Sequence, residues 1–126
     1  MTVIFSEKSS LDMGYETAVW QEVASKTGVL RPVENYLHFS VEYTGNIIEN
    51  KPLDTIPVEI RVLINGVEAG IDHFRPIDNT KYRKFGDFGV INPSSEMEYT
   101  ISLEVRAFNT GQTVKVRRIR LMVMQV

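Results

Sequence analysis

Apolar and polar side chains alternate along three stretches of the chain. Residues 36–43 are apolar at their odd positions and mostly polar at their even positions, and the same period of two runs through 58–64 and 99–107. Successive side chains of a strand point to opposite faces, so this pattern predicts strands with one buried face.

Two neighbouring runs are joined by the dipeptide Asn65-Gly66, which separates 58–64 from 67–71. A type I′ turn needs positive φ at both central positions, and Asn-Gly supplies it. We therefore predict a β-hairpin here. Residues 82–91 form a further expected strand, in which Gly86 and Gly89 indicate a bulge or a close backbone contact.

The last stretch, 114–126, changes phase. Its apolar residues occupy even positions at 114 and 116 but odd positions at 119, 121 and 123. A strand cannot change phase without an extra residue, so we predict a bulge near Arg117-Arg118. In the alternative, both faces are partly buried, for example by a neighbouring subunit, and Met122 and Met124 on the second face keep that alternative open.

Helical signals are nearly absent. The best helical candidate is 16–26, whose β-branched residues make a strand at least as good an interpretation. The segment 47–56 has the length of a crossover between sheets. Seven or eight strands at this spacing indicate an all-β fold, an antiparallel β-sandwich.

Composition removes several classes of function. The 126 residues fit a single domain spanning 1–126, and the absence of Cys excludes disulfides, Cys-ligated metals and a thiol nucleophile. A net charge of −2 argues against nucleic-acid binding. No segment is long and apolar enough to span a membrane, and residues 1–8 lack the pattern of a secretory signal. We accordingly expect no membrane association, and folding in a cytoplasm.

Motifs for catalysis or cofactors are missing. Neither His38 nor His73 accompanies a nucleophile motif, and no phosphate loop is present. We expect no enzyme activity and no cofactor. Asp72, Asp78 and Asp87 could gather a calcium ion, but their spacing matches no calcium loop, and solvated loop acids are the favoured interpretation.

A basic run occupies 115–120 and interleaves cations with apolar residues. A solvated strand face or a subunit contact is the favoured interpretation, and binding of phosphate or an acidic partner is the alternative. The residues assigned to the expected subunit interface are Arg118, Arg120, Met122 and Met124.

Aromatic side chains suggest a second kind of surface. Exposed rings can stack on sugars, although core packing is their commoner fate. The candidates for such a platform are Trp20, Tyr15, Tyr36, Tyr82 and Phe108. The residues assigned to the expected ligand surface are Tyr82, Arg83, Lys84 and Trp20.

The two C-terminal runs, 99–106 and 114–124, with a Thr-Gly turn between them, carry a family resemblance. They resemble the last two strands of jelly-roll domains found in phage head-decoration and tail proteins and in the C1q and tumour-necrosis-factor-like group. The resemblance covers 97–126 well and 34–92 in strand order. It implies a jelly-roll-like sandwich of about eight strands that forms trimers. It assigns no functional residue, no collagen-like repeat precedes it, and the first 30 residues match no pattern of these families.

Two functions from different classes follow. The first is a non-enzymatic phage structural protein, a jelly-roll homo-oligomer, with a trimer favoured, that binds a capsid or tail partner in the virion. The second is a carbohydrate-binding module that uses exposed aromatics to bind a glycan. A small enzyme on a cupin-like barrel is a weaker third hypothesis, because that fold uses several His as metal ligands.

Overall fold

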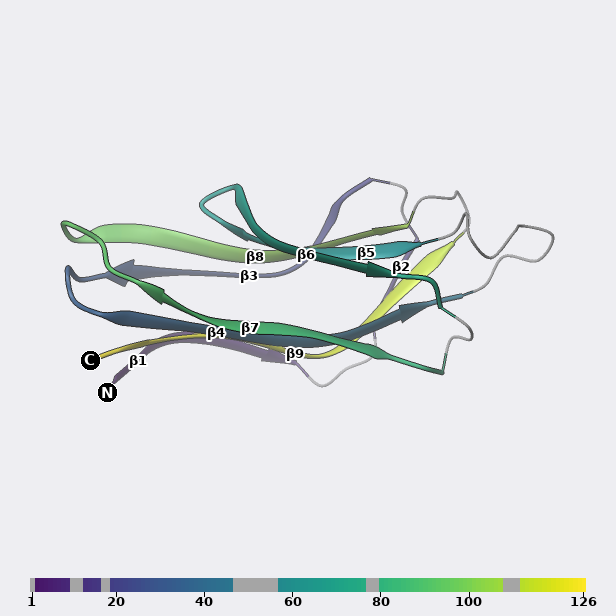
Figure 1. Cartoon of the computed structure of the whole chain (residues 1–126), viewed down its shortest axis with the longest axis horizontal. Helices are drawn as coiled ribbons and strands as arrows, with labels where there is room; N and C mark the ends of the chain where they lie inside the picture. The colour runs from purple at the N-terminus through teal and green to yellow at the C-terminus, as the bar shows by residue number, and fades with distance from the viewer. Residues whose placement is uncertain (1, 10–12, 17–18, 47–56, 77–79, 108–111) are drawn as a thin grey trace.

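In the computed structural model, two antiparallel sheets stack face to face as a β-sandwich (Figure 1). The structure describes residues 2–9, 13–16, 19–46, 57–76, 80–107 and 112–126. The first sheet has the order β1-β9-β4-β7, with β2 also paired to β9, and the second has the order β3-β8-β5-β6. The strands are β1 (Thr2–Ser9), β2 (Met13–Glu16), β3 (Gln21–Leu30), β4 (Asn35–Gly45), β5 (Val58–Ile64), β6 (Val67–Phe74), β7 (Arg83–Ile91), β8 (Met97–Ala107) and β9 (Thr113–Gln125).

This strand order is that of a jelly roll. Four nested antiparallel pairs, β1 with β9, β3 with β8, β4 with β7 and β5 with β6, form one long folded hairpin. The hairpin rolls up because β4 also pairs with β9, and β5 with β8. The expected all-β antiparallel sandwich is confirmed. The two ends of the chain lie side by side, since Thr2 pairs with Gln125.

The alternation predicted from sequence places the core. Each sheet turns one set of alternate side chains inward, and both sets pack on one cluster. Its members include Leu37, Phe39, Val41 and Tyr43 of β4, Ile101, Leu103, Val105 and Ala107 of β8, and Val114, Val116, Ile119, Leu121 and Val123 of β9.

The hairpin and the bulge are both confirmed. Asn65 and Gly66 have φ values of 50° and 79°, as a type I′ turn requires. In β9, Arg118 has a φ of 53°, and the register against β4 moves from Arg120–Ser40 to Arg117–Glu42. One extra residue of β9 is accommodated there, which moves the buried positions from even to odd numbers.

Gly86 makes the close backbone contact that its place in a strand suggested. A Cβ at this position would lie 2.7 Å from the carbonyl oxygen of Phe39 on β4. The alternative of a bulge is wrong, because β4 and β7 pair in continuous register from Asn35–Ile91 to Tyr43–Arg83.

β6 and β7 are edge strands of different sheets, and a polar contact links them. The Tyr43 hydroxyl donates to Asp72 Oδ2 over 2.7 Å, and Arg83 Nε donates to the same oxygen over 2.8 Å. Burial raises the pKa of the Tyr43 hydroxyl, and the bond to Asp72 raises it further. Burial also acts to raise the pKa of Asp72, but the bonds from Arg83 and Tyr43 outweigh it and hold that pKa below its usual range.

Three sequence-based expectations concern the remaining segments. The helical alternative for 16–26 is wrong, because the chain forms strand β3 from residue 21 onward. The crossover at 47–56 lies outside the described residues, although the strands on either side of it do belong to different sheets. Phe108 and Asp78 also lie outside the described residues.

Candidate functional site

Each sheet has one face that points away from the core. We call the outer face of β1-β9-β4-β7 face A and the outer face of β3-β8-β5-β6 face B. Directly paired residues of neighbouring strands point to the same side, so the register defines rows of side chains that run across each face. These rows are different in character on the two faces.

Face A has an apolar end. One row across it is Val3, Met124, Tyr36 and Val90, and the next is Ser6, Met122, His38 and Phe88. Phe88 is 54% exposed and Val3 53%, and the Tyr36 and Phe88 rings stack with centroids 5.6 Å apart. Apolar and aromatic side chains therefore cover this end of all four strands. They are exposed on the edge strands at Val3, Phe88 and Val90 and half-buried on the two middle strands.

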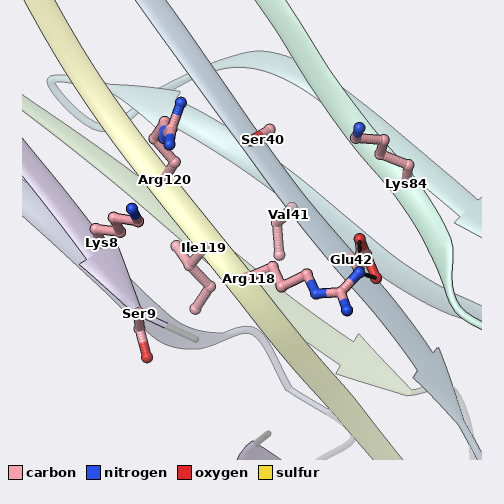
Figure 2. A pocket seen from close by; sticks show the side chains of 9 residues that line it. All are labelled: Lys8, Ser9, Ser40, Val41, Glu42, Lys84, Arg118, Ile119 and Arg120. Carbon is pink, nitrogen blue, oxygen red and sulfur yellow. Dashed lines mark hydrogen bonds and ion pairs between the residues drawn. The ribbon is translucent and has the colours of Figure 1, made fainter. Parts of the chain in front are cut away.

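Face A has a basic end beside that patch. The third row is Lys8, Arg120, Ser40 and Gly86, and Lys84 follows on β7. Figure 2 shows Lys8, Arg120 and Lys84 rising on one side of the sheet, with Val41 and Ile119 on the other. Lys8, Lys84 and Arg120 contact no carboxylate in the part of the chain that the structure describes.

Glu42 is the acidic residue at the basic end, and it forms ion pairs with two arginines. Arg117 Nε lies 3.0 Å from Glu42 Oε1, and Arg118 Nη1 lies 3.0 Å from Oε2. Burial acts to raise the pKa of Glu42, but the bonds from Arg117 and Arg118 hold that pKa below its usual range. The bulge makes this pairing geometrically feasible, because both arginines reach the same side of the sheet.

A hollow lies between the two ends. Gly86 has no side chain and Ser40 opposite it has a short one, so the sheet is uncovered at this point. Two adjoining cavities of about 620 and 380 Å³ meet here and share Ser40, Lys84 and Arg120 in their linings. His38, Asp87 and Phe88 line the larger one, and Lys8, Glu42 and Arg118 line the smaller one. The His38 Nδ1 atom is buried without a partner among the described residues.

Face B carries ion pairs on its middle strands β5 and β8, with Val29 and Ile71 exposed on the strands at its edges. Arg61 lies 2.6 Å from Glu104, and Arg106 lies 2.9 Å from Glu59. Both arginines also cover the Trp20 ring, with guanidinium carbons 4.1 and 4.4 Å from its centroid. The charges and the half-buried indole on this face are thereby engaged with one another.

The expected interface residues lie together on face A. Arg118, Arg120, Met122 and Met124 come from one strand, and β9 directs all four outward because of the bulge. Whether they contact another subunit stays a prediction.

The expected ligand surface is divided among three places. Lys84 lies at the basic end of face A, and Tyr82 is close by, under the guanidinium carbon of Arg117 at 3.7 Å. Arg83 instead points to Asp72 at the edge of the sandwich, and Trp20 lies on face B. Consecutive strand residues point to opposite sides, so Arg83 and Lys84 cannot share a surface.

Sequence reasoning missed three residues of face A, namely Lys8, Phe88 and Val90. The even positions of residues 36–43 signal the outer side of β4, but only strand pairing places these three residues beside it. Periodicity does not define which strands are neighbours.

Among the described residues, no three His, Asp or Glu side chains cluster in a way that could hold a metal ion. Asp72 is engaged with Tyr43 and Arg83, and Asp87 accepts a bond from the backbone nitrogen of Phe88. The described residues contain no helix capable of crossing a membrane.

Comparison with known proteins gives likenesses among solved structures, two of which follow. No protein-family model matches the chain, and no curated protein matches it. An insecticidal delta-endotoxin, Cry8Ea1 of Bacillus thuringiensis, is similar over 90% of this chain and 20% of its own length, with 12% identity and a TM-score of 0.49. Dimeric latent PorU of Porphyromonas gingivalis is similar over 94% of this chain and 13% of its own length, with 15% identity and a TM-score of 0.42. The chain thus spans a fifth or less of either protein.

Proposed function

We propose that this chain is a non-enzymatic structural subunit of a phage virion, a jelly roll that assembles with copies of itself through the apolar end of face A. One observation carries the proposal: an apolar patch, exposed at Val3, Phe88 and Val90, runs over all four strands of one sheet, whereas ion pairs cover the two middle strands of the opposite face. A patch of this kind on a small domain is typical of an association surface.

The side chains of the patch are those that interfaces favour. Methionine, tyrosine and phenylalanine are enriched in the buried centres of interfaces, and lysine and glutamate are depleted there. Met122, Met124, Tyr36 and Phe88 provide that centre, and the basic end of face A forms a charged rim on one side.

Charge supports a second copy as the occupant. The whole chain has a net charge of −2 although face A carries a cluster of cations, so the acidic excess lies on the rest of the molecule. Face A of one copy therefore complements another part of the next copy. A contact between two different surfaces forms a ring when the rotation from copy to copy closes, and a trimer is the smallest such ring.

The test is solution mass by light scattering behind size exclusion, at two concentrations, for the native chain and two variants. Met124→Glu places a charge in the patch and should raise the dissociation constant at least about tenfold, a cost near 1.4 kcal/mol. Val67→Glu is the matched control, because Val67 is 70% exposed but lies on β6 of the other sheet. Its mass should equal that of the native chain.

A native chain that stays monomeric at both concentrations would overturn self-assembly. A trimer that is lost in Val67→Glu and kept in Met124→Glu would place the contact on the wrong sheet. Once the trimer is established, cosedimentation with purified tailed-phage particles lacking this chain tests the virion role, and absence from reconstituted particles would contradict it.

A second candidate function, glycan binding, is favoured by the exposed Tyr36–Phe88 stack beside the hollow. A flat aromatic surface next to hydrogen-bonding groups is an arrangement suited to a sugar ring. A glycan array comparing the native chain with Phe88→Ala tests it. A response that survives the loss of the ring would remove this candidate.

A further inference from the structure

We infer that the hollow between the two ends of face A binds an acidic sugar, one that carries a sulfate or carboxylate group. The inference rests on the second candidate function and narrows its ligand class. It follows from the juxtaposition of unpartnered cations and an exposed aromatic ring around an uncovered part of the sheet.

The cations come from three strands and converge on one hollow. Lys8 of β1, Arg120 of β9 and Lys84 of β7 line the adjoining cavities. None of them contacts a carboxylate within the described chain, so their donors remain available to a ligand. Glu42 does not cancel them, because Arg117 and Arg118 already take both of its oxygens.

The hollow has the shape for a ring with an acidic substituent. Gly86 and Ser40 leave its floor open, and Phe88 borders the larger cavity on the side away from Lys8. A sugar stacked on Phe88 would direct its acidic group toward Arg120 and Lys84. Arginine binds planar carboxylate and tetrahedral sulfate oxygens with two parallel bonds, and lysine adds a point charge.

Polar groups beside the ring fit sugar hydroxyls. The Ser40 hydroxyl lines both cavities on the same side of the sheet as Phe88. His38 also lines the larger cavity, although its Nδ1 atom is buried. A neutral group in place of the acid would leave the three cations unused, so the site should prefer charged ligands over neutral ones.

The experiment is titration calorimetry with two disaccharides that differ only in one sulfate group, backed by a uronic-acid disaccharide. We expect saturable binding of the sulfated and uronic forms and at least about tenfold weaker binding of the neutral one. Raising the salt concentration should weaken binding of the charged forms, because the site is open to solvent.

Four variants locate the site. Lys84→Gln with Arg120→Gln should lower affinity for the charged sugars at least about tenfold, as should Ser40→Leu, which fills the floor of the hollow. Phe88→Ala should weaken charged and neutral forms by a similar factor. Arg75→Gln is the control, since it removes an exposed cation on the loop after β6 and should change nothing.

The outcomes distinguish failure of the glycan-binding function from failure of the preference for acidic sugars. Binding of neutral and charged forms with equal affinity, lost in Phe88→Ala, would keep the glycan function and overturn the acidic preference. Absence of binding for all three disaccharides would overturn both. Binding that persists in the Lys84 and Arg120 double variant and in Ser40→Leu would place the ligand elsewhere and overturn the assignment. Thermal unfolding of each variant shows that it is folded.

Discussion

The two outer faces of the sandwich share one core but differ in how far their cations are paired with acids. On face B, the register puts Arg61 opposite Glu104 and Glu59 opposite Arg106, so both arginines face a counter-charge, while Glu22 of β3 lies on the other side of Glu104. On face A, Lys8 lies opposite Arg120, two like charges in one row. Like charges directly opposite each other in a sheet are destabilising, and opposite charges are stabilising.

The difference indicates what each face is for. Charges that are paired within a sheet contribute to folding and leave few donors or acceptors for a partner. Like charges that face each other cost some stability in the isolated chain, and a ligand or another subunit that supplies a counter-charge offsets that cost. Face B is therefore interpreted as a structural surface, and face A as a binding surface.

The largest expected effect concerns Gly86, which forms part of the floor of the hollow on face A. In Gly86→Ala the new Cβ would meet the Phe39 carbonyl at 2.7 Å, so β4 and β7 must separate. We expect a loss of about 2–3 kcal/mol in the free energy of unfolding, by the usual cost of overpacking. Gly89→Ala on the same strand is the control, because a Cβ there meets no heavy atom within 4 Å. Urea denaturation of both variants measures the difference, and equal stability of the two would show that the strands do not approach closely at Gly86.

The next effect compares one arginine from each face. Glu59 is a buried acid whose side chain is 9% exposed, and Arg106→Gln would remove its cation. We expect a loss of about 1–2 kcal/mol, because the carboxylate would stay in place without a charged partner. Arg120→Gln on face A should change the free energy of unfolding by less than about 0.5 kcal/mol. A larger loss in Arg120→Gln than in Arg106→Gln would reverse the assignment of the two faces.

A smaller effect comes from the one acid that is paired at the basic end of face A. The pKa of Glu42 is lower in the folded chain than in the unfolded chain, where it is about 4.3. Its contribution is thus fully present above that value and is lost as the pH falls through the folded-state pKa. Glu42→Gln should cost about 0.5–1 kcal/mol at pH 7.

Urea denaturation of the native chain and Glu42→Gln at pH 7 and at about pH 3 measures this contribution. The gap between the two chains should narrow at the lower pH. A gap that stays constant would mean that the interaction of Glu42 with Arg117 and Arg118 does not depend on its charge.

Sequence reasoning predicted the fold and the β9 residues of face A. Alternation identified the buried side of β4 and β8, Asn65-Gly66 gave the turn, and the phase change in β9 gave the bulge. That bulge put Arg118, Arg120, Met122 and Met124 on one surface. Local sequence patterns do not show which strands lie next to each other. The expected ligand surface therefore combines Trp20 with Lys84, although these residues lie on opposite faces.

The smallest expected effect tests the repulsion itself. Lys8→Gln removes one of the two like charges in the row that contains Arg120, so the free energy of unfolding should rise by about 0.2–0.5 kcal/mol at low salt. Because salt screens exposed charges, raising the ionic strength from about 0.05 to 0.5 M should shrink that gain toward zero. Glu104→Gln on face B should show the opposite sign, a loss at low salt that shrinks as salt is added, since it breaks the pair with Arg61. Thermal unfolding across a salt series separates the two signs. If both variants lost stability with the same salt dependence, Lys8 would have a counter-charge in the folded chain, and face A would be as closed as face B.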